Sequence, residues 1–248
     1  MAWFCLNKSL LFLLAANVTL PEVMSHLQAT RNATDFRASG RLVRIDGQQR
    51  KNYQISMRGQ AAGGVLKIFC EVTEPAASRV RLLLESFPDG KNLIYTGHAG
   101  DAKATELPFE RWGERLLDTD FSFEDLMENQ FLWRNQSLGE QAVFGMRPSV
   151  VLKSVANPRD RTNYSAVTSW LDRDIFYPLK EEKTVKGSGI VKEFLFFGLR
   201  QSKGMWSASQ IECKTRGRSG STLLIITRGS EKARMDEKAF DPALLVKP

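Results

Sequence analysis

Apolar and polar residues alternate with a period of two along most of the chain, which is typical of β-strands. In residues 65–72, four apolar side chains share one face, while Lys67 and Glu71 share the other. This pattern predicts a sheet with one face toward a core and the other toward water.

Short turn sequences separate the strand-like segments. They include Asp46-Gly47, Gly63-Gly64, Asp172-Arg173-Asp174 and the glycine-containing turns at 186–189 and 217–220. These turns are too short for the helical crossovers that join parallel strands. We therefore expect roughly ten strands in one antiparallel meander. A sheet of that size either splits into a sandwich or curls into a barrel.

Two segments have the helical period of about 3.6 residues instead. Thr19 and Glu22 form a capping box, and the apolar residues of 20–27 make a single stripe, so we expect a helix that lies on another element. Near the middle of the chain, Ser122 and Asp125 have the spacing that starts a second helix, which would continue to Phe131.

The flanks of this central helix carry four carboxylates, Asp118, Asp120, Glu124 and Asp125. We expect them to cap the helix and to interact with the positive end of its dipole. A last short helix is predicted within 236–246.

Composition supports a folded, non-disordered chain. The 248 residues are 42% hydrophobic and 25% charged, and no fixed-period repeat or low-complexity linker interrupts them. The net charge of +7 is spread along the chain, and its densest cluster, residues 214–218, is expected at a hairpin tip. That tip is either solvated or in contact with lipid headgroups or a partner.

The N-terminus has the form of an export signal, because Lys8 precedes an apolar run over 10–16 that is too short to span a bilayer. We expect residues 1–16 to be this signal and 17–248 to form a single domain. A buried N-terminal helix is the alternative. After removal of the signal, Cys70 and Cys213 would remain, either as a disulfide or as two separately buried thiols.

Enzyme signatures are absent from the sequence. It has two histidines, no Gly-x-Ser-x-Gly elbow, no zinc-binding spacing of Cys or His, and no phosphate-binding loop. His98 and Asp101 fit a turn. We therefore expect no catalytic residues, no metal site, no cofactor and no nucleic-acid partner. The abundant apolar strand faces instead suit a wide barrel with either large side chains or a cavity inside.

The central residues Thr119 to Leu126 resemble the Ser-Asp-Phe-Ser-Tyr-Glu-Asp-Leu signature of the LolA/LolB-like superfamily of bacterial outer-membrane lipoprotein-sorting proteins. Weaker matches follow in the family's order at Gly40-Arg41-Leu42, 164–178 and Lys192-Glu193-Phe194, so the resemblance covers roughly 20–245. It implies an α+β, mainly β fold: an incomplete antiparallel barrel with covering helices over a hydrophobic cavity.

By this resemblance, the protein would be a soluble periplasmic carrier that binds acyl chains of lipoproteins or other lipids and moves them toward the outer membrane. An envelope transporter or outer-membrane receptor is a possible partner. The alternative is a non-enzymatic adaptor that works with such a transporter and has a packed barrel.

The residues expected to form the site fall into two sets, and plain core packing is the alternative role for each. The predicted cavity wall comprises Leu66, Ile68, Val72, Val80, Leu82 and Leu84, and the predicted lid helix carries Phe121, Phe123 and Met127.

Overall fold

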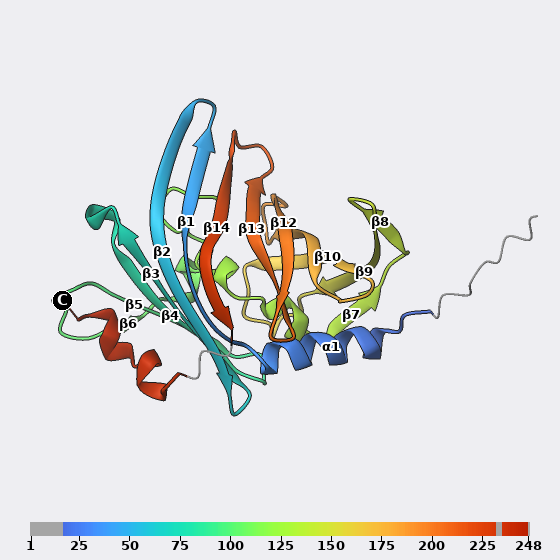
Figure 1. Cartoon of the computed structure of the whole chain (residues 1–248), viewed down its shortest axis with the longest axis horizontal. Helices are drawn as coiled ribbons and strands as arrows, with labels where there is room; N and C mark the ends of the chain where they lie inside the picture. The colour runs from blue at the N-terminus through green and yellow to red at the C-terminus, as the bar shows by residue number, and fades with distance from the viewer. Residues whose placement is uncertain (1–16, 232–234, 248) are drawn as a thin grey trace, which may run out of the picture.

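The computed structural model describes residues 17–231 and 235–247, so the predicted export signal over 1–16 lies outside the described residues. Within them, fourteen antiparallel strands form one open, strongly curved sheet (Figure 1). The predicted fold class is confirmed: the protein is mainly β, and its sheet does not close into a barrel. The order across the sheet is β6-β5-β4-β3-β2-β1-β14-β13-β12-β11-β10-β9-β7, with β8 paired to β9.

The strand count exceeds the predicted ten because β6, β7 and β8 have only two to four residues, too few for a period of two to be recognised. The strands are β1 (Asp35–Asp46), β2 (Gln49–Ala62), β3 (Val65–Glu74), β4 (Val80–Ser86), β5 (Asn92–Gly97), β6 (Thr105–Glu106), β7 (Asn135–Leu138), β8 (Ala142–Phe144), β9 (Arg147–Val155), β10 (Tyr164–Asp172), β11 (Pro178–Val185), β12 (Val191–Ser202), β13 (Met205–Thr215) and β14 (Ser221–Glu231).

A glycine permits the close pairing of β1 with β14 near the middle of the sheet. The register of this pair shifts between Ser39 and Gly40, which marks a bulge. A Cβ atom on Gly40 would lie 2.1 Å from the carbonyl oxygen of Ile225, so any other residue would push the two strands apart.

The two edges of the sheet are joined by residues 107–134, which we call the strap. It leaves β6 at one edge, crosses the concave face and enters β7 at the other edge. Its regular structure consists of three 3₁₀ turns, η2 (Phe109–Arg111), η3 (Glu124–Leu126) and η4 (Asn129–Leu132).

The predicted α-helix over 122–131 is therefore wrong. The Asp125 carboxylate accepts hydrogen bonds from the N–H and the hydroxyl of Ser122, both at 2.8 Å, but no side chain caps the turn η3. The turn ends at Leu126, and Met127 after it has an extended backbone. Because the carboxylates of this segment bond to distant strands, tertiary contacts override the local capping pattern.

The strap supplies much of the core on the concave face. Its buried apolar side chains pack against those of β1 to β5 and β12 to β14. The buried strap residues in this cluster are Leu107, Trp112, Leu116, Phe121, Phe123 and Met127.

Helix α1 (Leu20–Asn32) begins with the predicted Thr19–Glu22 capping box. It bridges the two arms of the curved sheet, the arm that contains β2 to β4 and the arm that contains β9 and β10. Val23 and Leu27 pack against an apolar cluster of β9 and β10. At the other end of the helix, the Arg31 guanidinium donates to the carbonyl oxygens of Gly64 at 2.9 Å and Ser86 at 2.6 Å. The prediction that this helix lies on another element is confirmed.

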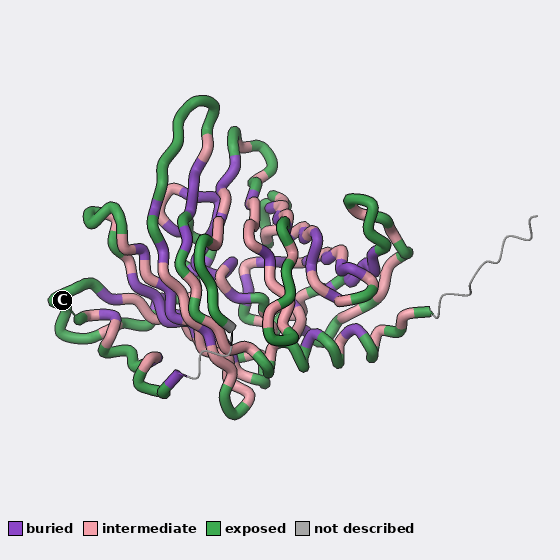
Figure 2. Tube along the Cα trace, in the orientation of Figure 1, coloured by how far each residue is buried: buried purple, intermediate pink, exposed green. Residues whose placement is uncertain are grey.

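The outer face of β3 and β4 is covered by the C-terminal segment, which forms the turns η5 (Glu237–Phe240) and η6 (Pro242–Leu245) instead of the predicted helix. Phe69 and Leu83 are buried there against Phe240 and Leu245. The prediction that this part of the sheet is wet on one side is thus wrong, and Figure 2 shows buried positions along these strands. By its alternation, Phe69 shares a face with the charged residues Lys67 and Glu71. The residues that bury Phe69 lie more than 160 positions later in the chain, so the local sequence does not reveal them.

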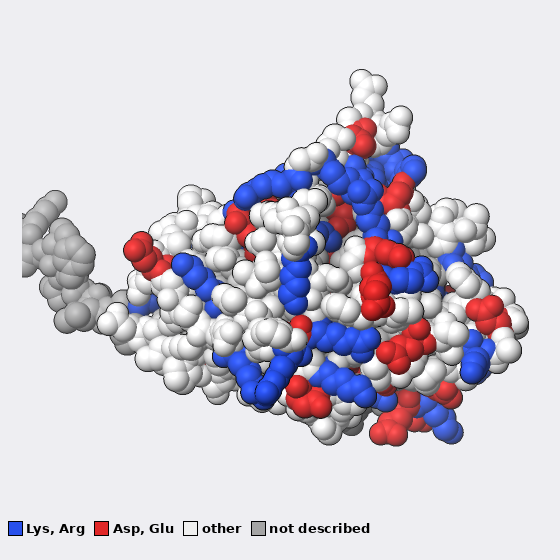
Figure 3. Space-filling view, turned by 180° about the vertical axis from the view of Figure 1, so that it is seen from behind, with Lys and Arg blue, Asp and Glu red and all other residues white. Residues whose placement is uncertain are grey.

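Charged side chains of both signs mix across the face seen in Figure 3. Lysine and glutamate also pair within and between neighbouring strands, as Lys180 of β11 does with Glu182 at 2.9 Å and with Glu193 of β12 at 3.0 Å. The predicted spread of the positive charge is confirmed, and the cluster 214–218 does lie at the tip of the β13–β14 hairpin.

Candidate ligand cavity under the strap

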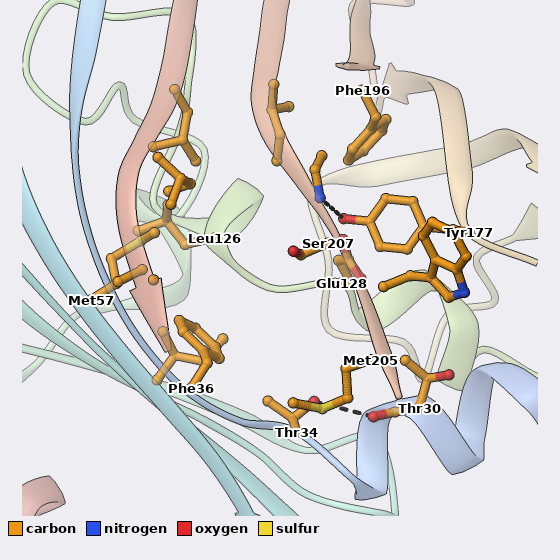
Figure 4. A pocket seen from close by; sticks show the side chains of 18 of the residues that line it. Thr30, Thr34, Phe36, Met57, Leu126, Glu128, Tyr177, Phe196, Met205 and Ser207 are labelled. Atoms are coloured by element: carbon orange, nitrogen blue, oxygen red, sulfur yellow. Dashed lines mark hydrogen bonds between the residues drawn. The ribbon is translucent and has the colours of Figure 1, made fainter. Parts of the chain in front are cut away.

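A cavity of about 340 Å³ lies between the strap and the concave face of the sheet. Its wall comes from β1, β2, β3 and β11 to β14, and residues such as Phe36, Met57 and Met205 project around it (Figure 4). The last turn of α1 contributes Thr30. Small-molecule sites typically have volumes of about 300–1,000 Å³, so this space suits one small or slender ligand.

The structure separates the residues predicted to form the site. Leu66, Ile68 and Phe121 line the cavity. The others belong to the adjoining hydrophobic core and do not line it: Val72, Leu82 and Leu84 are fully buried, Val80 is partly buried, and Phe123 and Met127 of the strap pack against the sheet. Sequence periodicity identifies the correct face of β3 and β4, but it cannot tell where along a face the packing stops.

One side of the cavity is polar, with Asp125 and Glu128 from the strap and Glu181 and Lys183 from β11. The sequence analysis did not predict this cluster. Glu181 and Lys183 alternate with exposed-looking residues of a hairpin, and a buried charge has no local signature. The only available signal was the family-like motif around Asp125.

Asp125 is the most strongly bonded carboxylate of this cluster. Its Oδ1 accepts a hydrogen bond from the Tyr164 hydroxyl at 2.6 Å, and its Oδ2 accepts from Ser122 and from the Lys192 ammonium. Burial by itself would raise the pKa of Asp125, but Lys192 and Lys183 outweigh this effect and lower the pKa to about 2. The carboxylate is therefore ionised at neutral pH.

Lys183 lies between two carboxylates without touching either closely. Its Nζ is 3.7 Å from Glu181 Oε2 and 3.9 Å from Asp125 Oδ1, and it lies 4.5 Å from the centre of the Phe194 ring. Burial opposes the charged form, yet the surrounding carboxylates raise the pKa of Lys183 overall. The ammonium is thus charged, buried and oriented by acidic neighbours and a ring face.

Glu128 differs from its neighbours because, within the described residues, its carboxylate has no hydrogen-bond or ion-pair partner at close range. Its side chain remains accessible because it borders the cavity (Figure 4). Partial desolvation against the cavity wall and the nearby charge of Glu181 raise the pKa of Glu128 to about 7, although Lys183 opposes this. The group therefore titrates near neutral pH.

Glu124 fastens the strap to the loop before β10. Its carboxylate accepts hydrogen bonds from the Thr162 hydroxyl and from the backbone N–H and side-chain amide of Asn163, the last two at 3.0 and 2.9 Å. Burial raises the pKa of Glu124, and these hydrogen bonds offset only part of the effect.

Asp120 fastens the strap to the middle of the sheet. Its carboxylate accepts from Thr222 at 2.8 Å and Thr215 at 3.0 Å, and it pairs with Arg218 at 3.3 Å and Arg44 at 3.5 Å. Asp120 is therefore satisfied by β1, β14 and the β13–β14 hairpin. The densest basic cluster of the sequence contributes one of these contacts.

Asp118 fastens the start of the motif to β2. It accepts a hydrogen bond from the Tyr53 hydroxyl at 2.5 Å and pairs with Lys51. Burial tends to raise the pKa of Asp118, but Lys51 and Tyr53 lower it overall. The expectation that these four carboxylates cap a helix is wrong for all of them, because each bonds mainly to strands or loops outside the strap.

Cys70, Cys213 and His98, the remaining candidates with reactive side chains, have structural roles. Cys70 and Cys213 are free, buried thiols, and burial raises the pKa of each. The predicted turn at His98 is confirmed, since its N–H donates to Asp101 Oδ2 at 2.7 Å. In residues 17–231 and 235–247, no group of three or more His, Cys, Asp or Glu could hold a metal ion. In the same ranges, no helix is long and apolar enough to cross a membrane.

Three solved structures have a similar fold over 90% of the chain. A domain from Vibrio parahaemolyticus, described as from an outer membrane lipoprotein-sorting protein, is 16% identical with a TM-score of 0.80 over 96% of its length. A DUF1329 family protein from Desulfovibrio piger is 12% identical with a TM-score of 0.82 over 96%. A LolA superfamily protein from Nitrosomonas europaea is 15% identical with a TM-score of 0.70 over 98%.

The comparison with curated proteins gave no match. A protein-family model described as "Uncharacterized protein" matches residues 102–247, a range that includes the strap and all strands from β6 to β14. The LolA-like fold that the resemblance implies is confirmed by these structures. Since the family model matches more than half of the chain, the protein belongs to this family of LolA-like fold, whose model is described as "Uncharacterized protein".

Proposed function

We propose that the protein is a carrier that binds the acyl chain of a lipid or lipoprotein in the cavity under the strap. The observation that carries the proposal is the cavity itself, which has a mostly apolar wall and lies on the concave face of an open LolA-like sheet. An adaptor with a packed barrel, the alternative from the sequence, would not need this space.

Hydrocarbon in such a cavity is stabilised by the hydrophobic effect. Transfer of one methylene group from water contributes about 0.8 kcal/mol, so even a short chain would be held firmly. Release then requires a membrane or a partner that offers the chain an equally apolar place. An envelope transporter as donor or an outer-membrane receptor as acceptor would meet that need.

The proposal also includes the compartment in which the protein works. With residues 1–16 as an export signal, the remaining domain would work in the periplasm and move its ligand toward the outer membrane. The protein would do so without chemistry on the ligand. The lipoprotein-sorting description of the similar domain from Vibrio parahaemolyticus supports this direction.

The test is binding of a fluorescent acyl probe to the full-length protein, with competing acyl chains of increasing length. Affinity should rise with chain length until the cavity is full. Ala208 lines the cavity and is buried, so Ala208→Phe should abolish probe binding by filling the space. Val143 is 73% exposed, and Val143→Phe is the matched control that should bind like wild type. Unchanged binding by a folded Ala208→Phe protein would contradict the proposal.

A further inference from the structure

The polar side of the cavity holds groups whose hydrogen-bonding capacity is not used. The Ser207 hydroxyl oxygen is buried and, within the described residues, has no hydrogen-bond partner. A buried hydroxyl without a partner costs free energy comparable to a lost hydrogen bond, so a ligand that supplies the partner would gain it.

The neighbouring side chains repeat this pattern. The Tyr177 hydroxyl oxygen accepts the Ala208 N–H at 3.1 Å, so its own hydrogen is free to donate. Lys183 Nζ has its nearest charged oxygens at 3.7 and 3.9 Å, beyond ordinary hydrogen-bond length. Figure 4 shows Ser207, Tyr177 and Glu128 projecting in the same part of the cavity.

The cluster also offers an acceptor near these donors, the Glu128 carboxylate. It borders the cavity and is near enough to Tyr177 and to Glu181 to change the pKa of Tyr177 and to have its own pKa raised by Glu181. The polar end of a ligand in this place therefore faces donors and an acceptor together.

The charge balance of the cluster disfavours an anion. Three carboxylates, those of Asp125, Glu128 and Glu181, face two ammonium groups, those of Lys183 and Lys192. A fatty-acid carboxylate would add a fourth negative group beside them, where like charges repel.

We propose that the cavity selects an amphiphile whose polar end is uncharged and carries both a hydrogen-bond donor and an acceptor, such as a hydroxyl or an amide. This assignment rests on the proposed carrier function and names its ligand class. Glu128 accepts from the donor of the ligand, and Ser207, with Tyr177 or Lys183, donates to its acceptor.

The titration of Glu128 makes the selection depend on pH. The groups that face it are Glu181 and Lys183 of β11, Asp125 of the strap and the Tyr177 hydroxyl. With a pKa of about 7, the Glu128 carboxyl is mostly neutral at pH 6 and mostly ionised at pH 8. Discrimination against a carboxylate ligand should therefore be stronger at pH 8.

The experiment compares monolauroylglycerol with laurate, which have the same acyl chain, by displacement of a fluorescent probe from the full-length protein at pH 6 and pH 8. We expect monolauroylglycerol to bind about tenfold tighter than laurate at pH 8, which corresponds to about 1.4 kcal/mol. The difference should narrow at pH 6. Glu128→Gln should raise the affinity for laurate at pH 8, and Ser207→Ala should weaken monolauroylglycerol by about threefold to tenfold.

The matched control is Asp118→Asn, which removes one negative charge outside the cavity and should leave both affinities unchanged. Arg37 and Arg200 also border the cavity and offer a carboxylate another position. Tighter binding of laurate that is lost in Arg200→Gln would overturn the headgroup assignment while leaving the carrier function intact. Failure of every amphiphile to bind would instead overturn the carrier function, and the assignment with it.

Discussion

The two ends of the acidic motif in the strap bring the same type of side chain into opposite surroundings. At one end, the Asp118 side chain is 39% exposed and its partner Lys51 is 61% exposed. At the other end, Asp125 is fully buried and Lys192 is 9% exposed. An ion pair in water contributes little to stability, whereas a buried carboxylate that loses its bonds leaves charges without compensation. The contribution of each carboxylate to the stability of the fold therefore depends on its exposure to water.

The largest expected effect is at the buried end. Asp125→Asn would leave the Lys192 ammonium without its close partner and would remove one of the two carboxylates beside Lys183, so we expect a loss of about 3–5 kcal/mol in the free energy of unfolding. Urea unfolding at pH 7 measures it. Asp118→Asn makes the same chemical change at the exposed end and should cost less than about 1 kcal/mol. Equal losses in the two variants would refute the comparison.

Acid should act on the buried end in the same way. The pKa of Asp125 is about 2 in the folded protein and about 3.9 in an unfolded chain, so its contribution is complete above pH 4 and is lost as pH falls toward 2. The decline in unfolding free energy between pH 4 and pH 2 should be smaller in Asp125→Asn than in wild type. An equal decline in wild type and Asp125→Asn would show that the ionisation of Asp125 does not contribute to the acid sensitivity.

An intermediate effect is expected where the strap is held by neutral donors. Thr162→Val keeps the shape of the side chain but removes the hydroxyl that donates to Glu124, leaving a buried acceptor less satisfied. We expect a loss of about 1–3 kcal/mol, measured by thermal or urea unfolding. Ser165→Ala, three residues further on, removes a hydroxyl that donates to the Thr184 carbonyl and does not contact Glu124; it is the control and should cost less.

Glu128 should give a smaller effect of opposite dependence on pH, because its side chain borders the cavity. Its folded pKa of about 7 lies above the ordinary value of 4.5, so the folded state binds the proton more tightly. Its contribution to stability is present below pH 4.5 and is lost as pH rises to 7. Glu128→Gln should gain stability relative to wild type between pH 5 and pH 8. A constant difference over that range would contradict this.

The smallest expected effect is at the exposed end. Lys51→Met removes the ion pair with Asp118 and should cost about 0.2–1 kcal/mol at low salt. Exposed charges are screened, so the difference from wild type should disappear in about 1 M NaCl. Persistence of the full difference at high salt would mean that Lys51 acts through packing and not through charge.

The fold could be predicted from the sequence where the cause was local. The Asp46-Gly47 hairpin, the Thr19–Glu22 cap and the strand β3 all depend on residues close together in the chain, and all are present. The predicted central helix is wrong because Ser122 and Asp125 fit the local capping rule, but Asp125 also bonds to Tyr164 and Lys192, which lie far away in the sequence.

The site could be predicted only in part, for the same reason. Leu66 and Ile68 were placed on the right face by their period of two, and Phe121 by the family-like motif. Glu181 and Lys183 could not be identified, because charged residues in a hairpin normally face water. Their burial results from the strap, which closes over them from a different part of the chain.

The long reach of the strap also governs the order of folding. Its hydrogen bonds span 67 residues to Lys51 and Lys192 and 102 residues to Thr222, so they cannot form until both arms of the sheet are in place. Closing such long loops makes contacts of high sequence separation slow. We therefore expect the strap to be the last part of the core to consolidate, which would leave the apolar concave face open to water and to other chains until then.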